Sequence, residues 1–239
     1  MKFTLLIILI FTQTSHAQIN LEDGLLAHYP FNGNADDNSG NNNHGSGSNV
    51  SLTTDRFENP DSAFEFNGTN SVISVPNSGS LSSPTTELTL VAWINAPSWS
   101  LVGSTTWAPV LMKSNVSTNA FQYRMSVGSN GMGTAINNWN NSAGSSAPIS
   151  FNQWYLLVTT FKDDTLNGYL NGLLIDSKPL TGPINLDTRP LEIGHDVPGA
   201  IEVFNGKIDD VRIYNRALNK HEIWELFNPN DIIFADEFE

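Results

Sequence analysis

Cysteine is absent from the 239-residue sequence. This excludes a disulfide framework, cysteine-ligated zinc or iron–sulfur sites and a thiol nucleophile. Charged residues are scarce at 15% of the chain, and bases are the rarer kind, with 11 Lys and Arg against 24 Asp and Glu. The net charge of −13 argues against nucleic acid or an anionic membrane surface as a partner.

Asparagine fills most of the polar positions that charged residues leave free. The chain has 29 Asn beside 18 Gly, and both residue types favour turns and tolerate a positive φ. Strong helix formers are few. The composition therefore predicts strands joined by polar turns, in a chain of the length that an all-β sandwich occupies as one domain.

Residues 1–17 have the features of a signal peptide. Lys2 precedes an apolar run, Leu5 to Phe11, and Ser15 and Ala17 are the small residues of a cleavage site after Ala17. The run is shorter than the roughly 20 residues that span a bilayer, although an uncleaved anchor is the alternative. We predict a secreted protein with no membrane span, which is extracellular, periplasmic or held at the cell surface.

Short runs of alternating apolar residues recur between clusters of Gly, Asn, Ser and Pro, a pattern typical of an antiparallel sandwich. The predicted strands are Leu25–Phe31, Ala63–Phe66, Ser71–Val75, Leu88–Ile94, Val110–Lys113, Phe121–Val127, Trp154–Phe161, Gly168–Leu170, Leu173–Asp176, Leu191–Gly194 and Lys207–Tyr214. Asn171-Gly172 predicts a type I′ hairpin turn. The fold class is therefore all-β.

One helix is predicted near the end of the chain. Asn219 and Glu222 have the spacing of a capping box, and Pro229 ends the apolar pattern that follows them. We expect this helix to cover one end of the sandwich. Residues 229–239 form an acidic tail, which is either a frayed end, a short edge strand or a sorting signal.

Several segments together resemble the bacterial, secreted LamG-like (laminin G-like) jelly-roll domains of the concanavalin A-like lectin/glucanase superfamily, over about residues 22–228. The segments are Gly24–Asp37, Ser39–Gly45, Phe66–Gly68, Leu88–Ile94, Tyr169–Gly172, Leu191–Gly194 and Gly206–Leu218. The resemblance implies two antiparallel sheets with a concave face, and carbohydrate binding or adhesion. In many members it also implies a structural calcium near the first loop and the last strand.

The catalytic motif of this superfamily, Glu-x-Asp-x(-x)-Glu on a strand, is absent from the sequence. Asp209 and Asp210 are adjacent, so an extended strand would point their side chains to opposite faces. A glycosidase needs two carboxylates that face one bond. We therefore predict a protein without catalytic residues.

Tryptophans in two polar segments are the candidates for carbohydrate binding. Trp99 and Trp107 lie in 96–109, and Trp139 lies in 128–148 beside Asn137 and Asn138. Long loops in compact domains tend to be functional, and the absence of Lys and Arg there favours a neutral glycan. The alternative is that each indole folds back under its own loop.

A calcium site is predicted where the first loop meets the last strand. Calcium binds six to eight oxygens, and the stretch 36–44 is rich in Asp, Asn, Ser and Gly. The predicted ligands are Asp36, Asp37, Asn42, His44 through its carbonyl, Asp209 and Asp210. Asp210 comes to that loop only through the strand arrangement that the resemblance implies. The alternative is an ordinary Asn-Gly turn with solvated aspartates.

The sequence thus predicts a secreted, non-catalytic carbohydrate-binding or adhesion module with a structural calcium (Ca2+) ion. A glycan or cell-surface polysaccharide is the expected partner. A structural or protein–protein interaction module and a glycan-cleaving enzyme are the alternatives, because a fold alone does not fix a function.

Overall fold

The computed structural model describes residues 19–97, 107–115, 120–128, 131–138, 140–144, 149–196 and 202–229. The predicted signal peptide and nearly all of the acidic tail lie outside the described residues. No helix in the described part of the chain is long and apolar enough to cross a membrane.

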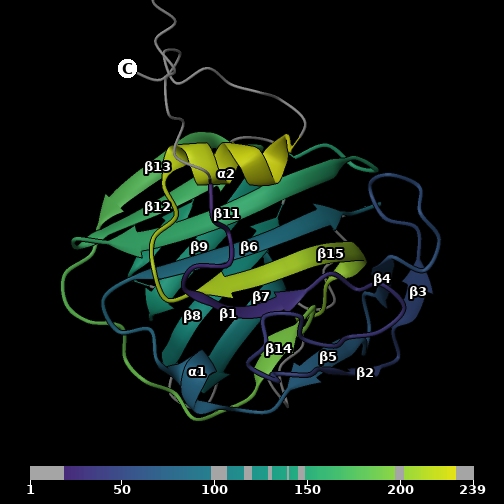
Figure 1. The fold of residues 1–239 in the computed structure, drawn as a ribbon, viewed down its shortest axis with the longest axis horizontal. Helices are drawn as coiled ribbons and strands as arrows, with labels where there is room; N and C mark the ends of the chain where they lie inside the picture. Colours follow the sequence, from purple (N-terminus) through teal and green to yellow (C-terminus); the bar gives the residue numbers. More distant parts are fainter. Residues whose placement is uncertain are drawn as a thin grey trace, which may run out of the picture.

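Two antiparallel sheets form the fold (Figure 1). Sheet A has the order β13-β12-β11-β6-β15-β4-β3, with β1 paired to β15. Its strands are β1 (Leu25–Tyr29), β3 (Ser51–Thr53), β4 (Ala63–Asn67), β6 (Leu88–Asn95), β11 (Trp154–Lys162), β12 (Thr165–Leu170), β13 (Leu173–Pro179) and β15 (Asn205–Tyr214).

Sheet B has the order β10-β9-β8-β7-β14-β5-β2. Its strands are β2 (Ser46–Ser48), β5 (Val72–Val75), β7 (Trp107–Asn115), β8 (Ala120–Gly128), β9 (Gly131–Asn137), β10 (Ser142–Gly144) and β14 (Leu191–Ile193). The helices in the described part of the chain are α1 (Gly79–Ser82) and α2 (Lys220–Phe227). Every predicted strand is present, which confirms the all-β jelly-roll sandwich.

The core fills the space between the inner faces of the two sheets. Leu90 and Ile94 of β6 in sheet A and Tyr123 and Met125 of β8 in sheet B are fully buried in one cluster. Successive side chains of a strand point to opposite faces. The residues that alternate with these core positions therefore lie on the outer faces, although Met112, Arg124, Ala135 and Glu192 of sheet B are themselves buried.

The predicted loop over 128–148 is wrong, because this segment contains β9 and β10. All seven residues of β9 are buried. Its Gly and Asn content suggested a turn, but Met132 and Ile136 point into the core and fix the segment as a strand. Likewise Trp107 opens β7 and does not belong to a loop.

The helix α2 has the predicted capping box, with both Asn219 and Glu222 side chains bonded to backbone N–H groups. It lies on the outer face of sheet A, beside β11 (Figure 1), and not over an end of the sandwich. There Ile223 and Leu226 pack in a second buried cluster with Trp93 and Leu156. That half of the outer face of sheet A is therefore covered.

The Asn171-Gly172 turn joins β12 and β13 as predicted. The φ angles of these two residues are 50° and 81°, which is the pair of left-handed conformations that a type I′ turn needs. The turn lies against α2, since a side chain added at Gly172 would start 2.9 Å from the ring of Trp224.

Candidate functional site

The outer face of sheet B carries a continuous row of residues in register across all seven strands. We call this the outer row. Its members are Ser46, Ser74, Glu192, Met112, Arg124, Ala135 and Ser142. The row combines two serines on one side with a carboxylate, a thioether and a guanidinium at its centre, and so is chemically varied.

Trp107 lies on the same outer face, because its neighbour Ala108 points into the core. Its indole ring lies over Gly133 of β9: a side-chain carbon added at Gly133 would meet ring atoms at 3.0 and 3.2 Å. Glycine at this position leaves the space that the ring occupies. Trp107 is only partly buried, so the structure holds an aromatic ring against the sheet surface.

Arg124 stands at the centre of the outer row and is completely buried. Its Nη2 lies 2.5 Å from the carboxylate of Glu202, and its Nη1 lies 3.9 Å from that of Asp196. Both acids belong to the segment that follows β14. The guanidinium is therefore neutralised within the chain and offers no free positive charge to an anionic ligand.

Glu192 lies between Ser74 and Met112 in the outer row. Its Oε1 accepts a hydrogen bond from Ser74 Oγ at 3.0 Å. Burial raises the pKa of Glu192, and the hydrogen bond from Ser74 opposes that rise. In contrast to Arg124, Glu192 forms no ion pair with any oppositely charged side chain among the described residues.

Of the other predicted sugar-binding residues, Asn137 and Asn138 are described, and neither joins Trp107. Trp99 and Trp139 lie outside the described residues. The Asn137 amide is engaged by the chain itself, since Nδ2 donates to the Pro183 carbonyl and Oδ1 accepts from the Asn185 N–H. The Asn138 side chain accepts the N–H of Asn140. Asn137 therefore holds the 183–185 segment against β9, and Asn138 stabilises a turn. Among the described candidates, Trp107 is the one that is placed as a sugar platform would be.

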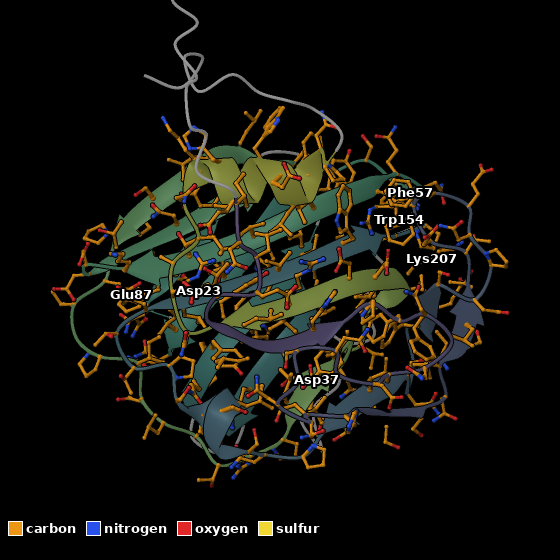
Figure 2. All side chains as sticks on the ribbon, in the orientation of Figure 1. Asp23, Asp37, Phe57, Glu87, Trp154 and Lys207 are labelled. Carbon is orange, nitrogen blue, oxygen red and sulfur yellow. The ribbon has the colours of Figure 1, made fainter. Side chains whose placement is uncertain are left out.

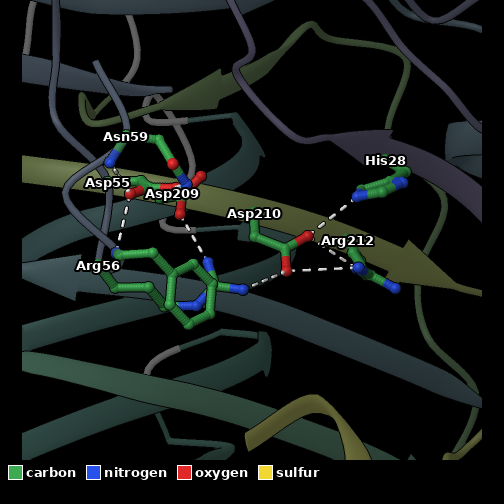
Figure 3. A network of polar contacts seen from close by, with 8 residues as sticks. His28, Asp55, Arg56, Asn59, Asp209, Asp210 and Arg212 are labelled. Atoms are coloured by element: carbon green, nitrogen blue, oxygen red, sulfur yellow. Dashed lines mark hydrogen bonds and ion pairs between the residues drawn. The ribbon is translucent and has the colours of Figure 1, made fainter. Parts of the chain in front are cut away.

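Asp209 and Asp210 point to the same side, contrary to our prediction (Figure 3). A bulge shifts the register of β15 between Asp209 and Arg212, and Asp210 has a φ of 46°. Such a bulge turns two successive side chains toward one face. Arg56 Nη1 lies 2.6 Å from Asp209 and its Nη2 lies 3.4 Å from Asp210, so one guanidinium binds both carboxylates.

The two carboxylates differ in their surroundings. Burial alone would raise the pKa of Asp210, but the hydrogen bond from His28 and the charge of Arg212 outweigh it and hold that pKa well below its ordinary value. Burial of the Asp209 carboxyl raises its pKa to about 7, although the charge of Arg56 opposes that rise. Asp210 is therefore the permanent anion of the pair.

The carboxylate of Asp37 accepts four hydrogen bonds at the first loop. Its Oδ1 accepts the N–H groups of His28 and Ser39, and its Oδ2 accepts the Ser39 hydroxyl and the Asn43 N–H, each at 2.9 Å. The pairing of β1 with β15 does bring Asp210 near this loop, because His28 donates its N–H to Asp37 and its ring nitrogen bonds Asp210 at 2.9 Å.

The preferred calcium ligands, Asp37 and Asp210, do not fit a metal ion in this arrangement. The oxygens of both accept hydrogen bonds from N–H or O–H groups, which face the lone pairs that calcium would need. Asp36 and His44 are exposed and contact each other at 3.3 Å, while Asn42 is an exposed turn residue with φ 58°. No group of three or more His, Cys, Asp or Glu in the described chain could hold a metal.

Calcium binding therefore stays a prediction, and thermal melting of metal-free protein decides it. An ion that binds only the folded state raises the melting temperature by mass action. If calcium binds as predicted, adding it raises the melting temperature, and the absence of a shift would mean that the hydrogen bonds at Asp37 and Asp210 hold those oxygens instead. A rise of several degrees, lost again in chelator and in Asp210→Ala, would restore the calcium site.

Sequence reasoning missed His28, Arg56, Arg124 and Glu192. For Arg124 and Glu192 a signal was present: each alternates with buried apolar residues inside a predicted strand, which places it on the outer face. Arg56 has no such signal, because its contact with Asp209 joins residues 153 positions apart.

A family model described as the concanavalin A-like lectin/glucanases superfamily matches residues 67–224. No curated protein matches the sequence. Among solved structures, domain 4 of AbnA, an extracellular arabinanase from Geobacillus stearothermophilus in complex with arabinotriose, is similar. It is 19% identical with a TM-score of 0.66, over 84% of this chain and 97% of that one.

Two toxin structures have the same fold. One is of botulinum neurotoxin type C, described as dependent for cell entry on two ganglioside molecules; identity is 18%, TM-score 0.65, and coverage 87% of this chain and 52% of that one. The other is the binding domain of Paraclostridial Mosquitocidal Protein 1. It is 20% identical with a TM-score of 0.68, over 88% of this chain and 53% of that one. This chain thus spans about half of each toxin chain. The family match and the two packed sheets show that the chain belongs to the concanavalin A-like lectin/glucanase superfamily.

Proposed function

We propose that the chain is a secreted, non-catalytic carbohydrate-binding module that holds a sugar chain on the outer face of sheet B. The observation that carries the proposal is the partly buried indole of Trp107, held over Gly133. A sugar ring stacks its apolar C–H side on such a ring, while polar groups beside it bind the hydroxyls. The serines and Glu192 of the outer row supply those polar groups.

The charge of this face supports a ligand without acidic groups. Arg124 is the only base in the outer row, and its guanidinium already binds Glu202. An anionic sugar would find no free cation there and would meet Glu192. Secretion is supported by the signal-like residues 1–17.

A binding role is favoured over a catalytic one by the content of the outer row. Glu192 is its single carboxylate, whereas a glycosidase places two carboxyl groups around the scissile bond. Glu202 and Asp196 lie against Arg124. Release of reducing ends from a polysaccharide by the purified protein would contradict the non-catalytic part of the proposal.

Replacing Trp107 with alanine should weaken glycan binding by about 1–3 kcal/mol, the scale of a lost aromatic contact. The melting temperature should change little, because the ring lies on the outside of the sheet. A glycan array on the mature protein identifies the ligand, and titration calorimetry then measures both affinities.

Two variants sharpen this test. Gly133→Ala keeps the indole but displaces it, since the new carbon would lie 3.0 Å from the ring, and should also weaken binding. Trp154→Ala removes a partly buried tryptophan from sheet A (Figure 2) and should leave the affinity unchanged. Equal binding by Trp107→Ala and wild type would show that the sugar binds elsewhere.

A further inference from the structure

Glu192 is a buried carboxylate without a counter-ion. The residue is 6% exposed, and the Ser74 hydroxyl is its hydrogen-bond partner. No Lys, Arg or His in the described part of the chain forms an ion pair with it. Buried charges in proteins are normally paired, because an isolated one is expensive to remove from water.

The neighbours of Glu192 cannot neutralise it. Ser74 and Met112, its partners in register, carry no charge. Arg124 is two strands away, which is about 10 Å at the spacing of adjacent strands, and its guanidinium is bound to Glu202. The basic side chain nearest in the outer row is thus committed to other acids.

A purely structural role does not account for this residue. The bond to Ser74 engages one carboxylate oxygen, and two apolar side chains paired across β5 and β14 would avoid the cost of burying the charge. The burial that raises the pKa of Glu192 would be offset by a cation on the outer side of the sheet.

We propose that Glu192 recognises a protonated amino group on the bound sugar chain, so that the ligand contains free amino sugars. The inference rests on the proposed carbohydrate-binding function. An ammonium group would complete the missing ion pair through charge-assisted hydrogen bonds, which are roughly twice as strong as neutral ones. A sugar hydroxyl could donate to the same oxygen but would leave the negative charge uncompensated.

The geometry of the face requires an oligosaccharide. Met112, which is opposite Glu192, and Trp107 are both on β7, with one irregularity between Pro109 and Leu111. At about 3.3 Å per residue the two sites are some 13–16 Å apart. One ring stacks on Trp107 while another ring, further along the same chain, presents its amine to Glu192.

The probes are tetramers of β-1,4-linked glucosamine and of N-acetylglucosamine, which differ in whether the amine is free. Calorimetry at about pH 6, where amino groups are protonated, should show tighter binding of the glucosamine tetramer by wild type. Glu192→Gln, which keeps the shape and the acceptor for Ser74, should weaken that binding about tenfold, the equivalent of about 1.4 kcal/mol. Its affinity for the N-acetylated tetramer should stay within about twofold.

The control is Glu65→Gln, which removes the same charge from an exposed position on β4 in sheet A and should change neither affinity. The inference is overturned if wild type fails to prefer the free amine, or if Glu192→Gln binds glucosamine as wild type does. If either of those outcomes occurs but Trp107→Ala still loses glycan binding, the amine proposal fails while the proposed carbohydrate-binding function stands. Wild type that binds no glycan at all would overturn both.

Discussion

Replacing Arg56 with methionine should lower the free energy of unfolding by about 1.5–3 kcal/mol, the scale of a lost hydrogen bond to a charged group, because Asp209, whose pKa is already raised to about 7, can take up a proton once the cation is gone. Two carboxylates lose their shared cation at once. Asp209 would keep no cation, while Asp210 would keep His28 and Arg212. The effect should therefore come mainly from Asp209, which is 3% exposed.

Arg56 also fixes the loop between β3 and β4 onto sheet A. Its guanidinium carbon lies 4.6 Å from the ring centre of Phe57 and 4.7 Å from that of Trp93. Contacts of this kind contribute about 0.5–2 kcal/mol each. Methionine would keep some of the packing but lose the charge, so the loss of the ion pairs can be measured separately from the loss of bulk.

Urea unfolding of wild type, Arg56→Met and the double variant Arg56→Met/Asp209→Asn measures these effects. The second change replaces the carboxyl group that has lost its cation with an uncharged amide and should recover part of the lost stability. Lys178→Met is the matched control, because its contact with Asp176 is exposed and 3.7 Å long, and exposed pairs contribute about 0–1 kcal/mol. A loss below about 1 kcal/mol in Arg56→Met would show that the pair contributes no more than a surface contact.

The Asp209–Asp210 pair shows where sequence reasoning reached its limit. The alternation of Lys207–Tyr214 correctly predicted a strand, and alternation alone sends successive side chains to opposite faces. The bulge reverses that conclusion, because Asp210 takes a left-handed φ of 46°. Aspartate tolerates this conformation better than most residues, but nothing in the sequence marks which aspartate adopts it.

Local patterns predicted well the parts of the fold that local physics decides. The capping box of α2 and the Asn171-Gly172 turn needed only a few neighbouring residues, and both were correct. The strand β9 was missed because its glycines belong to a long-range fit: Gly133 makes room for Trp107 from another strand. The same holds for the candidate site, whose outer row exists only after seven strands pair.

Lys113 is the second residue whose loss should be severe. Replacing it with methionine should lower the free energy of unfolding by at least about 3 kcal/mol, because three buried acceptors would lose their donor and each unsatisfied buried polar group costs about 1–3 kcal/mol. The side chain is fully buried. Its Nζ donates to Asn77 Oδ1, the Asp187 carbonyl and the Arg189 carbonyl, and so joins the segment before α1 to the segment before β14.

The chemistry of this contact requires an ammonium ion. Three acceptors surround the nitrogen, and only the protonated amine has three donors to offer. Burial lowers the pKa of Lys113 to about 8, and the carboxylate of Asp187 opposes that fall, so the charged form persists at neutral pH. Methionine has a similar length and no donor, which leaves the acceptors facing an apolar group.

Chemical unfolding gives the size of the loss, and hydrogen exchange shows where it arises. Exchange in Lys113→Met should rise first over 183–189, the segment that the ammonium holds. Lys162→Met is the control, since Lys162 is half exposed and pairs with Glu87 at 3.3 Å; its effect should stay below about 1 kcal/mol. If both lysine variants lost equally little, the oxygens around Lys113 would have found water in its place, and the contact would not be what holds this end of sheet B together.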